Sequence, residues 1–207
     1  MTKRALILVD IQNDFCPGGA LAVKDGDEVV EPANALAREF AASGDLVLAT
    51  QDAHPKDHKS FASQHEGTDV GEVIQLGGLD QVLWPDHCID GTYGAAFHPH
   101  IKSELIVKTF KKGTDRDVDS YSGFFDNGHK RATGLAEYLH EKEVEEVWVC
   151  GLATDYCVKA TALDAVAEGF KTVVYASACR AVEMASGDGK RAFDDMAAAG
   201  CLVVDES

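Results

Sequence analysis

Cys157 occupies a position where a cysteine could serve as a nucleophile. It follows an apolar, β-branched run at residues 144–150 and the turn residue Gly151, which predicts a buried strand that ends in a turn. After Asp155 the apolar residues recur at helical spacing up to Gly169, so Cys157 should lie in the first turn of a helix. Free backbone N–H groups and the helix dipole favour a thiolate there and could bind an oxyanion. From position alone, an inert buried cysteine is an equally good interpretation.

Two other side chains could complete a nucleophilic site. Asp10 directly follows an apolar run at residues 5–9, so partial desolvation should raise its pKa towards that of a proton shuttle. Lys112 stands just before Gly113 and could stabilise a thiolate, completing an Asp-Lys-Cys triad. Taken singly, Asp10 could equally cap a loop, and two nearby lysines compete with Lys112 for the same role.

A second group of residues has the composition of a metal site. Asp52 and His54 stand two positions apart after an apolar run, and in an extended segment both side chains would point to the same side. His87, in a Trp-Pro-Asp-His-Cys block, is the candidate third ligand. One Asp and two His with open positions suit a catalytic zinc, iron or manganese ion better than a closed structural site. His58 and Ser60 could add a ligand directly or through water, and each histidine could also bind nothing.

Apolar runs that alternate with helical segments indicate the fold class. Strands are expected at residues 5–9, 46–49, 105–107, 144–150, 170–176 and 201–204. Helices are expected at residues 27–43, around 132–139, from 156 to 168 and around 192–197. This order predicts an α/β fold with a doubly wound, mostly parallel β-sheet that is flanked by helices on both faces. The polar stretch 53–99 is the kind of long loop that usually carries function.

The candidate residues follow different strands of this predicted sheet. Asp10, Asp52, Lys112 and Cys157 each come shortly after a separate apolar run. In a parallel sheet the carboxyl ends of the strands share one edge, where such folds bind their ligands. We therefore expect all four side chains to meet in one crevice.

The overall composition limits the classes of partner. The 207 residues predict one domain over 1–207, and 35 acidic against 19 basic residues give a net charge of −16. This balance argues against a nucleic-acid or anionic-membrane partner. Six scattered cysteines without a paired motif indicate reduced thiols and a cytoplasmic location. The apolar stretch near the N-terminus is too short for a signal peptide.

Several blocks of the chain resemble one family. Residues 151–158 read Gly-Leu-Ala-Thr-Asp-Tyr-Cys-Val, and this segment is similar to the nucleophile loop of the isochorismatase-like cysteine hydrolases, especially their nicotinamidase branch. The segments around Asp10, Asp52, His87, Lys112 and Tyr121 resemble further family blocks and occur in the family order.

The resemblance implies a role for each residue. Cys157 would be the nucleophile, Asp10 the general base and Lys112 the third triad member. The Leu152–Ala153 peptide would be cis, and the backbone N–H groups of Ala153 and Cys157 would form the oxyanion hole. The metal ligands would be Asp52, His54 and His87, a full set that isochorismatase-type members do not share. The substrate pocket would include Phe15, Trp84 and Tyr121, although Trp84 and Tyr121 could also be packing residues.

The resemblance also implies an activity. A chain of this branch would hydrolyse nicotinamide to nicotinate and ammonia through a cysteine thioester, in nicotinamide recycling. One divalent ion, zinc with iron or manganese as alternatives, would orient the pyridine ring. The partner would be a small amide, and a homo-oligomer is possible because family members commonly associate.

Three alternatives to this activity stay open. The chain could be a related cysteine amidase acting on another small amide or carbamoyl compound. It could also be an inactive metal-binding protein of the same fold. Finally, the metal could activate water while Cys157 is only structural.

Overall fold

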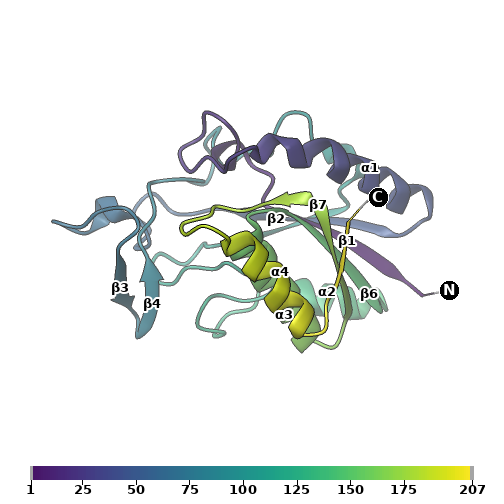
Figure 1. Ribbon diagram of the computed structural model, residues 1–207. Helices are drawn as coiled ribbons and strands as arrows, with labels where there is room; N and C mark the ends of the chain where they lie inside the picture. The colour runs from purple at the N-terminus through teal and green to yellow at the C-terminus, as the bar shows by residue number, and fades with distance from the viewer. Residues whose placement is uncertain (1, 206–207) are drawn as a thin grey trace.

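The computed structural model describes residues 2–205 and contains a parallel β-sheet at its centre (Figure 1). Its strands, in spatial order, are β5 (Lys108–Lys112), β2 (Leu46–Asp52), β1 (Arg4–Val9), β6 (Glu146–Leu152), β7 (Lys171–Arg180) and β8 (Leu202–Val204). Every neighbouring pair in this sheet is parallel. The continuous apolar runs of β1 and β6 are buried because helices cover both faces of the sheet.

The helices lie on the two faces as a doubly wound fold requires. Helix α1 (Val30–Ala42) packs on one face, against β1, β2 and β7. Helices α2 (Leu135–Glu141), α3 (Lys159–Ala167) and α4 (Asp188–Ala198) lie on the other side of the sheet (Figure 1). The predicted fold class is therefore confirmed. Within residues 2–205, no helix combines the length and the apolar character needed to cross a membrane.

One strand prediction is wrong in position. The apolar residues 105–107 were expected to form a strand, but Leu105 lies in a 3-10 turn and Val107 is 59% exposed. The strand is instead β5, in which Phe110 and Lys112 point inward and alternate with exposed residues. Because β5 is at the edge of the sheet, its sequence need not be continuously apolar. Lys112 is consequently the last residue of a strand and does not follow one.

The stretch 53–99, expected to be loop, contains a β-hairpin. Strands β3 (Val73–Leu76) and β4 (Leu79–Val82) pair antiparallel and form a separate sheet. Figure 1 shows this hairpin standing apart from the six-stranded sheet. The two strands are short, and seven of their eight residues are exposed or half-buried, so they lack the apolar pattern of a core strand.

The sheet order reverses between β1 and β6. The connections from β1 to β2 and from β6 to β7 run outward in opposite directions, with α1 and α3 on opposite faces. Such a switch point leaves a crevice at the carboxyl ends of the two strands. At this point Gly151 is paired with Val9 at a φ of 127°, and a Cβ atom on Gly151 would collide with the Val9 backbone. Glycine is therefore required where the ends of β1 and β6 approach each other.

Candidate active site

The four side chains expected at the carboxyl edge do meet there. Asp10 directly follows β1, Asp52 ends β2 and Lys112 ends β5. Cys157 lies beyond β6, in a π-helical turn spanning Thr154–Val158 that leads into α3. Parallel strand direction alone brings these four residues together, although they come from four segments far apart in the sequence.

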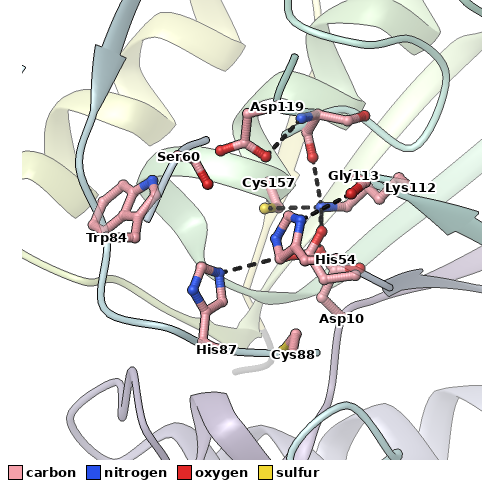
Figure 2. Close-up of polar contacts among 12 residues, drawn as sticks. Asp10, His54, Ser60, Trp84, His87, Cys88, Lys112, Gly113, Asp119 and Cys157 are labelled. Carbon is pink, nitrogen blue, oxygen red and sulfur yellow. Dashed lines mark hydrogen bonds and ion pairs between the residues drawn. The ribbon is translucent and has the colours of Figure 1, made fainter. Parts of the chain in front are cut away.

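Lys112 is the centre of the cluster. Its ammonium lies 2.9 Å from Asp10 Oδ2, 2.5 Å from Asp52 Oδ1 and 3.4 Å from Cys157 Sγ, and it donates to the Ser120 carbonyl at 2.9 Å. Figure 2 shows the ammonium between Asp10 and Cys157. Burial acts to lower the pKa of Lys112, but Asp10 and Asp52 outweigh it and raise that pKa well above its usual value. The side chain is therefore a buried cation.

Asp10 is a buried carboxylate with the properties of a proton acceptor. It is fully buried, and Thr50 Oγ1 donates to its Oδ1 at 2.7 Å. Desolvation raises the pKa of Asp10 to about 6, with Lys112 opposing this and Asp52 adding to it. The expected rise in pKa is confirmed, and its main cause is burial.

The thiol of Cys157 differs from the sequence expectation. Burial raises its pKa well above the usual value, and the nearby ammonium of Lys112 only partly offsets this. The negative charge of the Asp10 carboxylate raises the pKa of Cys157 further, and the hydrogen bond that this carboxylate accepts from the thiol adds to the effect. The sequence expectation of a thiolate at this position is thus not met in the free protein, because desolvation favours the thiol. Cys157 needs a neighbouring base to become nucleophilic.

The backbone before Cys157 has the expected conformation. The Leu152–Ala153 peptide bond is cis. The carbonyl of Ala153 accepts hydrogen bonds from the backbone N–H groups of Tyr156 and Val158, which closes the π-helical turn around the cysteine. Ala153 and Cys157 consequently lie against the same cavity.

Asp52, His54 and His87 form a group that could hold a metal ion. Asp52 Oδ2 lies 3.6 Å from His54 Nε2 and 3.9 Å from His87 Nε2. The other ring nitrogens are hydrogen-bonded to backbone carbonyls, His54 Nδ1 to Gly113 at 2.9 Å and His87 Nδ1 to Pro85 at 2.7 Å. Such bonds orient an imidazole for metal binding. His54 Nε2 is buried without a hydrogen-bond partner, so the residues present fit a divalent ion.

The charge states of Asp52 and His87 suit a metal, whereas Asp52 outweighs the effect of burial on His54 and raises the pKa of that imidazole. Burial acts to raise the pKa of Asp52, but Lys112 and His54 outweigh it, so the pKa is lowered and the residue is a carboxylate. Burial and the neighbouring His54 lower the pKa of His87 to about 4. A neutral imidazole and a carboxylate are the forms that bind metals.

A second candidate group shares His54 and includes one residue that the sequence analysis missed. His54, His58 and Asp119 place their ligand atoms close together, and all three are buried. His58 Nδ1 is hydrogen-bonded to Ser60 Oγ at 2.7 Å, while His58 Nε2 is buried without a partner. In the sequence, only the position of Asp119 just before the block that contains Tyr121 could have pointed to it.

A cavity with about 360 Å³ of empty space, part of it open to solvent, adjoins both groups. Its lining includes the three predicted pocket residues Phe15, Trp84 and Tyr121, as well as Cys157 and the candidate metal ligands. The cavity thus has a thiol on its wall, aromatic sides and a set of metal-ligating side chains. This is the composition of a site for a small, flat, partly polar molecule.

Three further lining residues were not identified from the sequence, namely Leu21, Tyr156 and Val182. The Tyr156 ring makes edge contacts with Trp84 and Tyr121, at centroid distances of 4.9 and 5.4 Å. The position of Tyr156 next to Cys157 in the sequence could have identified it. No sequence pattern points to Val182, because this residue lies just after the end of β7, far along the chain.

Comparison with known proteins gives one consistent result. A sequence model of the Isochorismatase domain matches residues 4–206. A nicotinamidase of Escherichia coli K12 is 50% identical over 203 residues, covering 98% of this chain and 95% of that protein. The structure of an Acinetobacter baumanii nicotinamidase/pyrazinamidase superposes with a TM-score of 0.93 at 42% identity, covering 99% of this chain and 97% of the other. The structure of a Pyrococcus horikoshii pyrazinamidase in complex with zinc gives 0.80 at 36% identity and 99% coverage of both.

Proposed function

The chain belongs to the isochorismatase family, and on that premise we propose that it is a nicotinamidase, which hydrolyses nicotinamide to nicotinate and ammonia. One observation carries this proposal: a single cavity is bounded by Cys157 with its Asp10–Lys112 pair and by the Asp52–His54–His87 group. A carboxamide held at the thiol would have its ring against aromatic walls. The nitrogen of that ring would lie within reach of the group formed by Asp52, His54 and His87.

The reaction begins with proton transfer. Asp10 takes the proton of Cys157, and the sulfur attacks the carboxamide carbon. Lys112 stabilises the charges of both partners because it lies within 3.4 Å of each. The backbone N–H groups of Ala153 and Cys157 donate to the oxyanion of the tetrahedral intermediate.

Collapse of that intermediate breaks the carbon–nitrogen bond. Asp10 returns its proton to the departing nitrogen, which leaves as ammonia and creates a thioester on Cys157. Asp10, again a carboxylate, then removes a proton from a water molecule that attacks the thioester. The carbon–sulfur bond then breaks, Asp10 returns the proton to the sulfur, and the released nicotinic acid ionises to nicotinate, so the same carboxylate serves both halves of the reaction.

Asp52, His54 and His87 would hold one divalent ion, for which we propose zinc because its common ligands include carboxylate and neutral imidazole. When bound, this ion supplies a Lewis-acidic site for the pyridine nitrogen, directly or through water, and so orients the ring. Phe15, Trp84 and Tyr121 confine the ring from the sides.

The test is ammonia release from nicotinamide by the zinc-loaded protein. Cys157→Ala should lower kcat by at least about 10³-fold, because no other nucleophile remains. Cys201→Ala is the matched control, since Cys201 is also a buried cysteine but lies outside the cavity lining, and it should keep full activity.

Three outcomes would contradict the proposal. Turnover by Cys157→Ala near the wild-type rate would exclude the thioester route. Activity that chelation abolishes but iodoacetamide does not would indicate a metal-activated water. No ammonia from nicotinamide, together with release from another small amide, would identify a related amidase.

A further inference from the structure

The hairpin of β3 and β4 has one side chain directed into the protein. Both strands lie in the described part of the chain, and of their residues only Gln81 is buried, at 3% exposure. A two-stranded hairpin is marginally stable in water by itself. A buried amide within it must find hydrogen-bond partners in the body of the protein.

Two of the three hydrogen-bond partners of Gln81 line the cavity. The two hydrogens of its Nε2 are shared among three acceptors, namely the Val82 carbonyl at 2.7 Å and, at 3.2 Å each, Asp119 Oδ2 and the Tyr121 hydroxyl. The Tyr121 oxygen also accepts a hydrogen bond of 3.2 Å from Trp84 Nε1. Asp119, Tyr121 and Trp84 all line the cavity, whereas Gln81 is not part of that lining. One amide outside the cavity therefore contacts two of its lining residues directly and a third, Trp84, through the Tyr121 hydroxyl.

These bonds restrict the geometry of the walls. A tyrosine oxygen has two lone pairs and one hydrogen. With N–H groups of Gln81 and Trp84 on the lone pairs, the hydroxyl hydrogen of Tyr121 is confined to one remaining direction. Asp119 is held at both oxygens, since Oδ1 accepts from the Ser120 backbone N–H at 2.7 Å. In Figure 2, Trp84 lies on the side of Cys157 away from Lys112, and the network meets the triad only through Ser120, whose carbonyl accepts from Lys112 Nζ at 2.9 Å.

We propose that Gln81 is a positioning residue of the substrate pocket, setting the orientations of Asp119 and Tyr121 directly and that of the Trp84 indole through the Tyr121 hydroxyl. The inference rests on the proposed function only for the choice of substrate. Gln81 acts on binding and not on bond breaking, because its side chain contacts the pocket walls and none of Asp10, Lys112 and Cys157.

The first experiment compares Gln81→Met with Gln75→Met. Methionine has nearly the length of glutamine but no donor. Gln75 is an exposed glutamine on the paired strand, and its amide contacts the exposed Asp80. Gln81→Met should raise KM for nicotinamide about tenfold and change kcat less than about threefold, because it removes uniform binding. Gln75→Met should change neither by more than about twofold.

The second experiment needs no substrate. Trp84 and Trp148 are the two tryptophans of the chain, so a Trp148→Phe background isolates the Trp84 fluorescence. Gln81→Met should shift the Trp84 emission and increase its quenching by acrylamide, whereas Gln75→Met should leave both unchanged. If the wild-type protein releases no ammonia from nicotinamide, the proposed function fails, yet the fluorescence still tests the role of Gln81.

A double-mutant comparison completes the test. Tyr121→Phe removes the shared hydroxyl, so its effect on KM should be smaller in the Gln81→Met background than in the wild type. Strictly additive effects, an unchanged KM with unchanged Trp84 fluorescence, or equal effects of Gln81→Met and Gln75→Met would overturn the inference. If Gln81→Met does not fold, Gln81→Asn provides the same comparison, because it withdraws the amide by one methylene.

Discussion

At the scale of single residues, the site depends on charge taken out of water. Lys112 lies between two carboxylates in a fully buried cluster, while Cys157 is kept as a thiol by desolvation. A buried ion pair of this kind is weak support for stability, so its place here is better explained by chemistry. The thiol and Asp10 can exchange a proton without water. The ammonium of Lys112 stabilises the remaining negative charge, whether it lies on the sulfur or on the carboxylate.

This arrangement predicts the pH dependence of the reaction. Since burial raises the pKa of Asp10 to about 6, protonation of the carboxylate below that pH removes the base for Cys157. kcat/KM for nicotinamide should therefore fall about tenfold per unit as the pH drops below about 6. The measurement is a kcat/KM profile between about pH 4.5 and 8.

Thr50→Val provides the control for the pH profile. The Thr50 hydroxyl donates to Asp10 at 2.7 Å and lowers the pKa of that carboxylate. Removing the donor should destabilise the carboxylate, raise its pKa and move the acid limb to higher pH. A limb that stays in place or moves to lower pH would show that another group controls the profile.

At the scale of secondary-structure elements, the site depends on how close β1 and β6 come at their carboxyl ends. Gly151 is paired with Val9 and allows Asp10 and the turn that carries Cys157 to approach each other. The edge strand β5 contributes in another way, because its alternating pattern turns Lys112 inward. The hairpin of β3 and β4 carries Gln81 to the outer side of the same cavity.

Gly151→Ala should therefore destabilise the protein strongly. A Cβ atom would collide with the Val9 backbone at a φ that only glycine adopts readily, and we expect a loss of about 2–4 kcal/mol in the free energy of unfolding. Gly169→Ala is the matched control, because Gly169 also has a positive φ but no atom near its would-be Cβ. It should cost about 1 kcal/mol. Urea unfolding measures both, and equal losses would show that the contact with Val9 does not matter.

At the scale of the whole molecule, the chain is strongly acidic, with a net charge of −16. The buried cluster also contains more carboxylates than ammonium groups, since Asp10 and Asp52 face a single lysine, Lys112. A divalent ion on Asp52, His54 and His87 would offset this excess of negative charge and bind only the folded chain, in which the three ligands converge. Metal binding should consequently contribute to global stability.

Metal removal tests this coupling. The zinc-loaded protein should contain one equivalent per chain, and chelation should lower Tm by about 3–8 °C. His87→Ala should lose most of the metal and most of the Tm difference. His100→Ala, which changes an exposed histidine, should retain both. Equal metal content in the two variants would place the ion elsewhere.

The parallel α/β fold, the family and the residues gathered at the carboxyl edge could all be predicted from the sequence. These features depend on local patterns, because apolar runs and helical spacing involve residues that are close together in the sequence. The parallel direction of the strands then places Asp10, Asp52 and Cys157 together. The tertiary structure alone decided the position of β5, the protonated state of the Cys157 thiol, and the parts played by Asp119, Val182 and Gln81. The physical reason is that edge exposure, desolvation and hydrogen bonds between distant segments depend on which parts of the chain pack together.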